Sequence, residues 1–145
     1  MNDRSILPAV AAAIFNQDGE ILLQKRKDVD AWCIISGHVE FGETISEAIL
    51  REIVEETDTP AEIVRFIGVY SSPASQTYHY DGKTVQYVTS YFEARLTTRL
   101  PSHFSNAETK ELRFFPPGEI PADLAQLNPF WLTDALNKQE GAFMR

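Results

Sequence analysis

Residues 37–59 read GHVEFGETISEAILREIVEETDT, and this stretch carries the densest pattern of the chain. Thr44 is followed three residues later by Glu47, which matches the capping box that begins many helices. We therefore predict a helix that has Thr44 as its N-cap and runs to about Thr57. Its apolar side should pack against the rest of the protein. That side comprises Ile49, Leu50, Ile53 and Val54.

The same predicted helix carries Glu52, Glu55 and Glu56 within an arc of about 100°. Like charges at these spacings repel one another and destabilise an isolated helix, so a positive partner is expected. Arg51 can reach Glu55 one turn away, but one guanidinium does not neutralise three carboxylates. Clustered carboxylate oxygens suit a hard divalent cation, Mg²⁺ first and Mn²⁺ as an alternative. A solvated acidic helix face is the other interpretation of the pattern.

The wider spacing resembles the signature of the Nudix hydrolases, G-x5-E-x7-R-E-U-x-E-E-x-G-U, in which U is apolar. The matching positions are Gly37, Glu43 and the run from Arg51 to Glu56. Two positions depart from the signature, because Asp58 replaces a glycine and Thr59 replaces an aliphatic residue. Neither departure removes a carboxylate, so we expect an active site.

The resemblance implies an α/β fold, namely an α/β/α sandwich with a mixed β-sheet. It also implies that Glu52, Glu55, Glu56 and the carbonyl of Gly37 bind the metal, while Arg51 orients the glutamates. Composition and periodicity alone indicate only a mixed α/β domain with roughly six strands and two helices.

The general base is left open at this point. Resemblance to the family points to Glu52 or to a downstream glutamate that precedes or lies on the last core strand. Of the downstream candidates, Glu111 is the first choice and Glu108 the second. Three further residues are candidates for substrate binding: Arg26, His38 and Tyr80.

The resulting functional hypothesis is metal-dependent hydrolysis of a phosphoric anhydride bond. The substrate would be a nucleoside diphosphate linked to a second group, such as ADP-ribose, or a nucleoside or deoxynucleoside triphosphate. Two alternatives remain open. One is a nucleotide-sensing domain without catalytic activity, and the other is a pyrophosphohydrolase that acts on a non-nucleotide diphosphate.

Composition limits the class of protein. The 145 residues are expected to form a single domain over residues 1–145, with 43% hydrophobic residues and one cysteine, Cys33. The net charge of −8 argues against a nucleic-acid polymer or an anionic membrane as partner. We find no membrane span or signal peptide in the sequence, so a cytoplasmic location is expected. Homodimers are common in the family that the chain resembles.

The remaining elements are predicted from apolar runs and turn residues. Asp18-Gly19 and Asp81-Gly82 are each expected to form the turn of a β-hairpin. Asn128 and Pro129 are expected to begin a terminal helix. The predicted strands cover residues 7–15, 20–25, 32–35, 62–70, 85–96 and the stretch before Pro116. The predicted loops include 71–76 and 100–106, and the terminal helix covers about 129–139.

Overall fold

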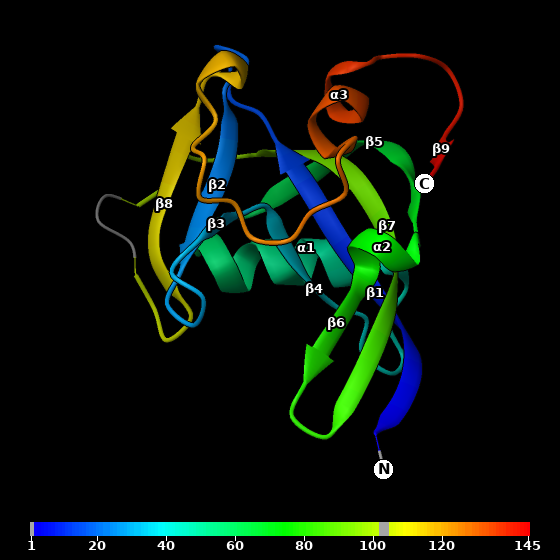
Figure 1. Ribbon diagram of the computed structural model, residues 1–145. Helices are drawn as coiled ribbons and strands as arrows, with labels where there is room; N and C mark the ends of the chain where they lie inside the picture. Colours follow the sequence, from blue (N-terminus) through cyan, green and yellow to red (C-terminus); the bar gives the residue numbers. More distant parts are fainter. Residues whose placement is uncertain (1, 102–104) are drawn as a thin grey trace.

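Two β-sheets form the framework of the computed structural model, which describes residues 2–101 and 105–145 (Figure 1). The larger sheet has the strand order β4-β1-β7-β5-β9, with β6 also paired to β7, and the smaller sheet has the order β3-β2-β8. The strands are β1 (Asp3–Ile14), β2 (Ile21–Arg26), β3 (Trp32–Cys33), β4 (Ile35–His38), β5 (Ala61–Tyr70), β6 (Thr77–Tyr80), β7 (Lys83–Leu96), β8 (Thr109–Phe115) and β9 (Phe143–Met144). The helices are α1 (Ile45–Thr57), α2 (Pro73–Gln76), α3 (Trp131–Leu136) and a short 3₁₀ turn (Pro117–Glu119).

The larger sheet lies between helices on its two faces. Along β1, alternate side chains point to opposite faces because a strand has a period of two residues. Val10, Ala12 and Ile14 pack in a buried cluster with α1, whereas Ala11 and Ala13 pack in a second cluster with α3. Strands β1 and β7 are parallel, and β5 and β7 are antiparallel. The predicted α/β/α sandwich with a mixed sheet is therefore confirmed.

Helix α1 forms as its sequence predicts. Thr44 accepts a hydrogen bond from the Glu47 backbone, and the Glu47 side chain accepts one from the Thr44 backbone. The helix ends at Asp58, which adopts the left-handed conformation with φ 53° in place of the glycine of the signature. Ile49 and Ile53 are fully buried, as expected, but Val54 is 45% exposed, so the apolar face is narrower than predicted.

The hairpin predicted at Asp18-Gly19 is only partly correct. The turn is present, and Asn16 Oδ1 accepts hydrogen bonds from the backbone of Asp18 and Glu20. Beyond one bridge between Phe15 and Ile21, however, β2 leaves β1 and joins the smaller sheet. The strand predicted over residues 32–35 likewise divides into β3 in the smaller sheet and β4 in the larger one. Strands β1 and β4 thus belong to the larger sheet, and β2 and β3 belong to the smaller one, so the two sheets diverge where the chain passes between them.

Two other predicted segments differ from the structure. The loop predicted over 71–76 contains the short helix α2. The terminal helix is shorter than predicted, because α3 begins after Phe130 and ends before Asn137. Strand β9 was not predicted and pairs with β5 at Gly68, where an added Cβ would lie 2.3 Å from the Phe143 carbonyl oxygen. Part of the predicted loop 100–106, residues 102–104, lies outside the described residues.

Candidate active site

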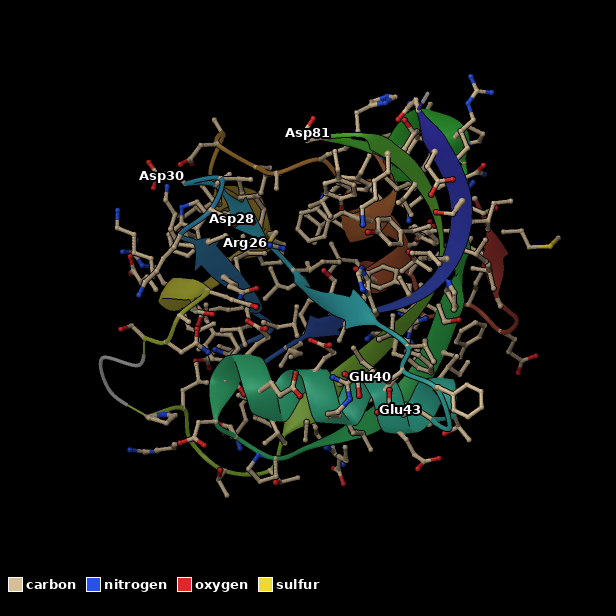
Figure 2. The ribbon with its side chains drawn as sticks, turned by 90° about the horizontal axis from the view of Figure 1, so that it is seen from below. Arg26, Asp28, Asp30, Glu40, Glu43 and Asp81 are labelled. Carbon is tan, nitrogen blue, oxygen red and sulfur yellow. The ribbon has the colours of Figure 1, made fainter. Side chains whose placement is uncertain are left out.

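A cleft of about 990 Å³ opens between the diverging sheets, with α1 along one wall. Figure 2 views the molecule from this side and shows Arg26 and Asp28 across from Glu40, which lies in the loop before α1. The cleft is lined from both sheets and from the segment that precedes α3. Glu52, Glu55, Glu56 and Gly37, the predicted metal ligands, all line this cleft.

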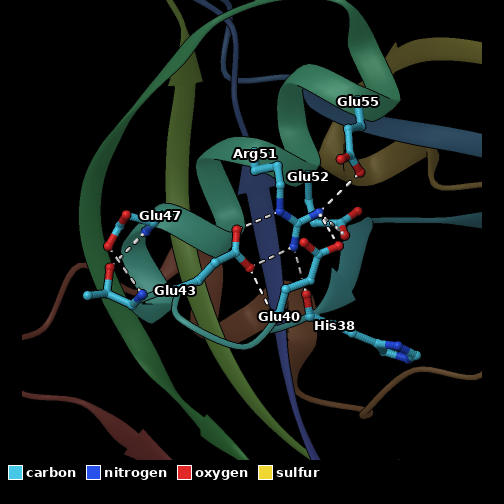
Figure 3. Close-up of polar contacts among 8 residues, drawn as sticks. His38, Glu40, Glu43, Glu47, Arg51, Glu52 and Glu55 are labelled. Atoms are coloured by element: carbon cyan, nitrogen blue, oxygen red, sulfur yellow. Dashed lines mark hydrogen bonds and ion pairs between the residues drawn. The ribbon is translucent and has the colours of Figure 1, made fainter.

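Arg51 is the centre of the polar network beside the cleft (Figure 3). Its guanidinium donates to both carboxylate oxygens of Glu43, at 2.6 and 2.9 Å, and to the backbone oxygen of His38 at 3.0 Å. It also donates to Glu52 at 2.9 Å and to Glu55 at 3.1 Å. Each of these bonds occupies a donor of a planar, rigid group, so Arg51 sets the relative positions of the glutamates. These contacts are the ones that the predicted orienting role of Arg51 requires.

Glu52 occupies space that only a glycine leaves open. A Cβ added to Gly37 would lie 2.1 Å from Glu52 Cδ and 2.2 Å from Glu52 Oε1. Burial raises the pKa of the Glu52 carboxyl to about 7, Arg51 opposes this rise, and the nearby Glu55 and Glu56 add to it. A carboxylate held out of water beside other carboxylates gains strongly from a cation.

Glu56 is bound by polar side chains from the smaller sheet. Gln24 Nε2 donates to Glu56 Oε2, and Thr109 Oγ1 donates to the same oxygen at 3.1 Å. Burial raises the pKa of Glu56, and a hydrogen bond to Glu108 raises it further. Gln24 and Thr109 are buried with Glu56, whereas Glu108 is exposed and lies along the cleft.

The other glutamates have different surroundings. Glu55 lies along the cleft with its side chain 53% exposed. Glu111, the first choice for a downstream base, does not line the cleft. Its carboxylate binds Arg113 on the same strand, because residues two apart on β8 point to the same face. Glu108, the second choice, is the downstream glutamate that the structure brings to the site.

The proposed substrate-binding residues all line the cleft. Arg26 is held by both oxygens of Asp28, at 2.9 and 2.7 Å. His38 stacks against Tyr87 at 5.3 Å between ring centroids, and its Nε2 lies 3.1 Å from the Tyr87 hydroxyl. The Tyr80 hydroxyl lies 3.0 Å from the same hydroxyl. His38, Tyr80 and Tyr87 thus form an aromatic wall.

The donor set fits a divalent cation. In the described part of the chain no three His, Cys, Asp or Glu side chains are already arranged around one metal position. Glu52 and Glu56 nevertheless lie buried on one wall, and the space at Gly37 is filled by a carboxylate oxygen. Oxygen ligands of this kind are those that Mg²⁺ and Mn²⁺ prefer.

Sequence reasoning missed Gln24 and Thr109, and it selected Tyr80 but not its neighbour Tyr87. Gln24 follows Leu22 at the strand period, so its side chain lies on the face of β2 that Leu22 presents to α1. A buried position in an apolar strand is unusual for glutamine, and this was the available signal. Thr109 and Tyr87 carry no comparable signal, because threonine and tyrosine are common in strands.

Comparison with known proteins gives consistent results. A family model described as NUDIX domain matches residues 6–134. An ADP-ribose pyrophosphatase of Methanocaldococcus jannaschii is 46% identical over 70 residues, which are 46% of this chain and 41% of that protein. An RNA pyrophosphohydrolase of Cereibacter sphaeroides is 42% identical over 62 residues, which are 41% of this chain and 38% of that protein. The matches thus span about two fifths of the length of these curated relatives.

The fold also matches solved structures. The crystal structure of a UDP-X diphosphatase superposes with a TM-score of 0.75 at 26% identity, and the match covers 90% of this chain and 61% of that chain. No helix of residues 2–101 or 105–145 has the length and apolar character needed to cross a membrane.

Proposed function

This chain belongs to the Nudix family, and on that premise we propose that it is a metal-dependent pyrophosphohydrolase. Its substrate would be a nucleoside diphosphate linked to a second group. The observation that carries the proposal is the pair of buried carboxylates, Glu52 and Glu56, on one wall of the cleft. Keeping two carboxylates out of water costs free energy, and a bound cation offsets that cost.

Glu52, Glu55, Glu56 and the carbonyl of Gly37 are the residues that would hold the cation. When bound, Mg²⁺ would neutralise charge on the diphosphate and acidify a water molecule. Arg51 keeps Glu52 and Glu55 in place through the hydrogen bonds described for its guanidinium. Arg51 itself is fully engaged with glutamates and a backbone oxygen, so it positions ligands and does not bind substrate.

For the general base we propose Glu108. It lies along the cleft beside Glu56, and water reaches its side chain. A carboxylate at this place can accept a proton from a water that attacks phosphorus. The loop that carries it is held near α1, because the Asn106 amide donates to the Glu55 backbone oxygen at 3.2 Å and Asn106 Oδ1 accepts from the Glu108 backbone at 2.9 Å. Glu52 remains the alternative base.

The aromatic wall supports a substrate with a planar group. His38, Tyr80 and Tyr87 line the same cleft as the glutamates, so a bound diphosphate would place an attached base or second group near them. Aromatic faces stack on any nucleobase. Arg26 lies in the same cleft, and substrate phosphate could compete with Asp28 for its guanidinium.

The rim of the cleft favours a small substrate over an RNA end. Figure 2 shows acidic side chains on the loops around it: Asp28, Asp30, Glu40 and Asp81. The side chains of Asp28, Asp30 and Glu40 are 56%, 73% and 65% exposed, and they pair with Arg26, Lys110 and Arg51 at 2.7, 3.6 and 3.7 Å. A polynucleotide leaving the cleft would bring further phosphates toward these carboxylates, and like charges repel. A nucleoside diphosphate that ends in a neutral group avoids this repulsion.

The test is a screen for products with purified protein and Mg²⁺. The panel contains ADP-ribose, other nucleoside diphosphate derivatives, deoxynucleoside triphosphates, a 5′-triphosphorylated RNA and a non-nucleotide diphosphate. We expect a nucleoside monophosphate from a small nucleotide, and loss of at least about 10²-fold in kcat in Glu56→Gln. Binding without any product would indicate a nucleotide sensor and would overturn the proposal, as would near-normal turnover by Glu56→Gln.

The proposal extends to the organisation of the chain. It treats residues 1–145 as a single Nudix domain, which is supported by the family match over residues 6–134. It includes no nucleic-acid polymer or membrane among the partners, in keeping with the net charge of −8. The homodimer and the cytoplasmic location stay predictions.

A further inference from the structure

The buried amide of Gln24 lies beside Glu56 at the inner end of the cleft. Gln24 is 4% exposed, and its Nε2 donates to Glu56 Oε2 and to Thr109 Oγ1, the latter at 2.5 Å. On the other side of the amide, Cys33 Sγ lies 3.8 Å from Gln24 Oε1. The thiol lies closer to the Gln24 backbone oxygen, at 3.7 Å, so the amide orientation is set by Glu56, whose carboxylate accepts a hydrogen bond and therefore faces the amide nitrogen.

Thr109 completes the arrangement through its single hydroxyl. Its Oγ1 accepts from Gln24 and donates its proton to Glu56 Oε2 at 3.1 Å. Thr109 is fully buried, and its backbone nitrogen donates to Asn106 Oδ1 at 2.7 Å. Both donors therefore bind the same oxygen of Glu56 from fixed positions, and neither bond uses Oε1.

We propose that Gln24 and Thr109 are positioning residues that hold Glu56 through Oε2 so that its other oxygen, Oε1, is presented to a divalent cation. This inference rests on the proposed function. The two residues act through Glu56 and not on the substrate. Both donors belong to the smaller sheet, and α1 carries the acceptor. The bonds therefore also fix the distance between α1 and the smaller sheet. The carboxylate then needs no rearrangement when the cation arrives.

The test measures Mn²⁺ binding without substrate, by the electron paramagnetic resonance signal of free Mn²⁺. Gln24→Met keeps the volume of the side chain and removes its donors, and Thr109→Val removes the hydroxyl. We expect each to weaken Mn²⁺ binding by about 10-fold to 100-fold. Thr109→Ser keeps the hydroxyl and should retain the affinity of the wild type.

A matched control is available elsewhere in the cleft. Gln76 is also a buried amide of the cleft, but it donates to Thr89 Oγ1 at 2.7 Å and to no glutamate. Gln76→Met should therefore bind Mn²⁺ as the wild type does. In Gln24→Met combined with Thr109→Val, the loss should be smaller than the product of the two single losses, because both act through one carboxylate.

The outcomes separate the two proposals. If the wild type does not bind Mn²⁺, the proposed function fails. If the wild type binds Mn²⁺ and Gln24→Met and Thr109→Val bind it equally well, only the positioning role is overturned. A loss in Gln76→Met as large as in Gln24→Met would also overturn it. Thermal melts in EDTA establish that each variant is folded, and if Gln24→Met is not, the comparison of Thr109→Val with Thr109→Ser decides the question.

Discussion

Replacement of Glu52 by glutamine should stabilise the metal-free protein while it removes activity. The folded environment raises the pKa of Glu52 from 4.5 to about 7. At about 1.36 kcal/mol per pH unit, this difference corresponds to about 3.4 kcal/mol of destabilisation by the charged form. The cleft is open to water, which screens the charge, so we expect a gain of about 1–2 kcal/mol in the free energy of unfolding at pH 8.

The pH dependence of that gain has a definite sign. Because the pKa of Glu52 is raised in the folded state, the protein carries no penalty below pH 4.5, and the penalty is complete above about pH 7. Glutamine does not titrate. Urea unfolding in EDTA should therefore give equal free energies for variant and wild type near pH 4.5, and a more stable variant at pH 8.

Addition of Mg²⁺ at pH 8 should reverse the order. A cation present at about 100 times its dissociation constant stabilises the wild type by about 2.7 kcal/mol, and the variant should gain much less. Glu111→Gln is the control, because this carboxylate binds Arg113 outside the cleft; it should change the free energy of unfolding by less than about 0.5 kcal/mol. The reasoning is refuted if Glu52→Gln is less stable than the wild type in EDTA at pH 8, or if it gains as much from Mg²⁺.

Three further outcomes are expected. Gly37→Ala should lower kcat by about 10²-fold without unfolding the protein, because the new Cβ would lie 2.1 Å from Glu52 Cδ and must displace that carboxylate. Steady-state kinetics measure kcat, and circular dichroism shows whether the variant is folded. Normal turnover by Gly37→Ala would contradict the prediction. Glu108→Gln should lower kcat by at least about 10²-fold with Mn²⁺ affinity retained if Glu108 is the base; unchanged kcat would transfer that role to Glu52. Asp134→Asn should lower the free energy of unfolding by about 3 kcal/mol, since Asp134 is 3% exposed and binds Arg145 at 2.9 and 3.0 Å. Burial alone would raise the pKa of Asp134, but Arg145 lowers this pKa below its ordinary value. The stabilisation by Asp134 is therefore present at neutral pH and is lost as the pH falls below the ordinary aspartate range. Urea unfolding at pH 7 and pH 3 measures the effect of Asp134→Asn, and an equal loss of free energy at both values would contradict the assignment.

Local chemistry made α1 predictable. The capping box at Thr44 and Glu47 needs only residues three apart, and the left-handed Asp58 that ends the helix depends on its own backbone. The turn at Gly82, with φ 76°, is local in the same way and forms as predicted between β6 and β7. The spacing of Gly37, Glu43, Arg51 and the glutamates of α1 also indicated the family, because the whole signature lies within one short stretch of sequence.

Other features depended on contacts between distant segments. The Asp18-Gly19 turn forms as predicted, yet β2 leaves β1 to pair with β8, which lies about ninety residues further along the chain. No local sequence pattern indicates which sheet a strand will join, because the choice of pairing partner depends on burial against residues far away in the sequence. The division between β3 and β4 has the same origin, and it opens the cleft.

The sequence by itself determined the acidic helix, the arginine that orders it and the family to which the chain belongs, because each depends on residues within the short stretch from Gly37 to Thr59. Only the tertiary structure decided which glutamates are buried, that Glu108 and not Glu111 reaches the cleft, and that Gln24 and Thr109 bind Glu56. Those facts depend on how two sheets diverge around the helix. The free energy of that arrangement comes from burial shared among many distant residues, and no short stretch of sequence contains it.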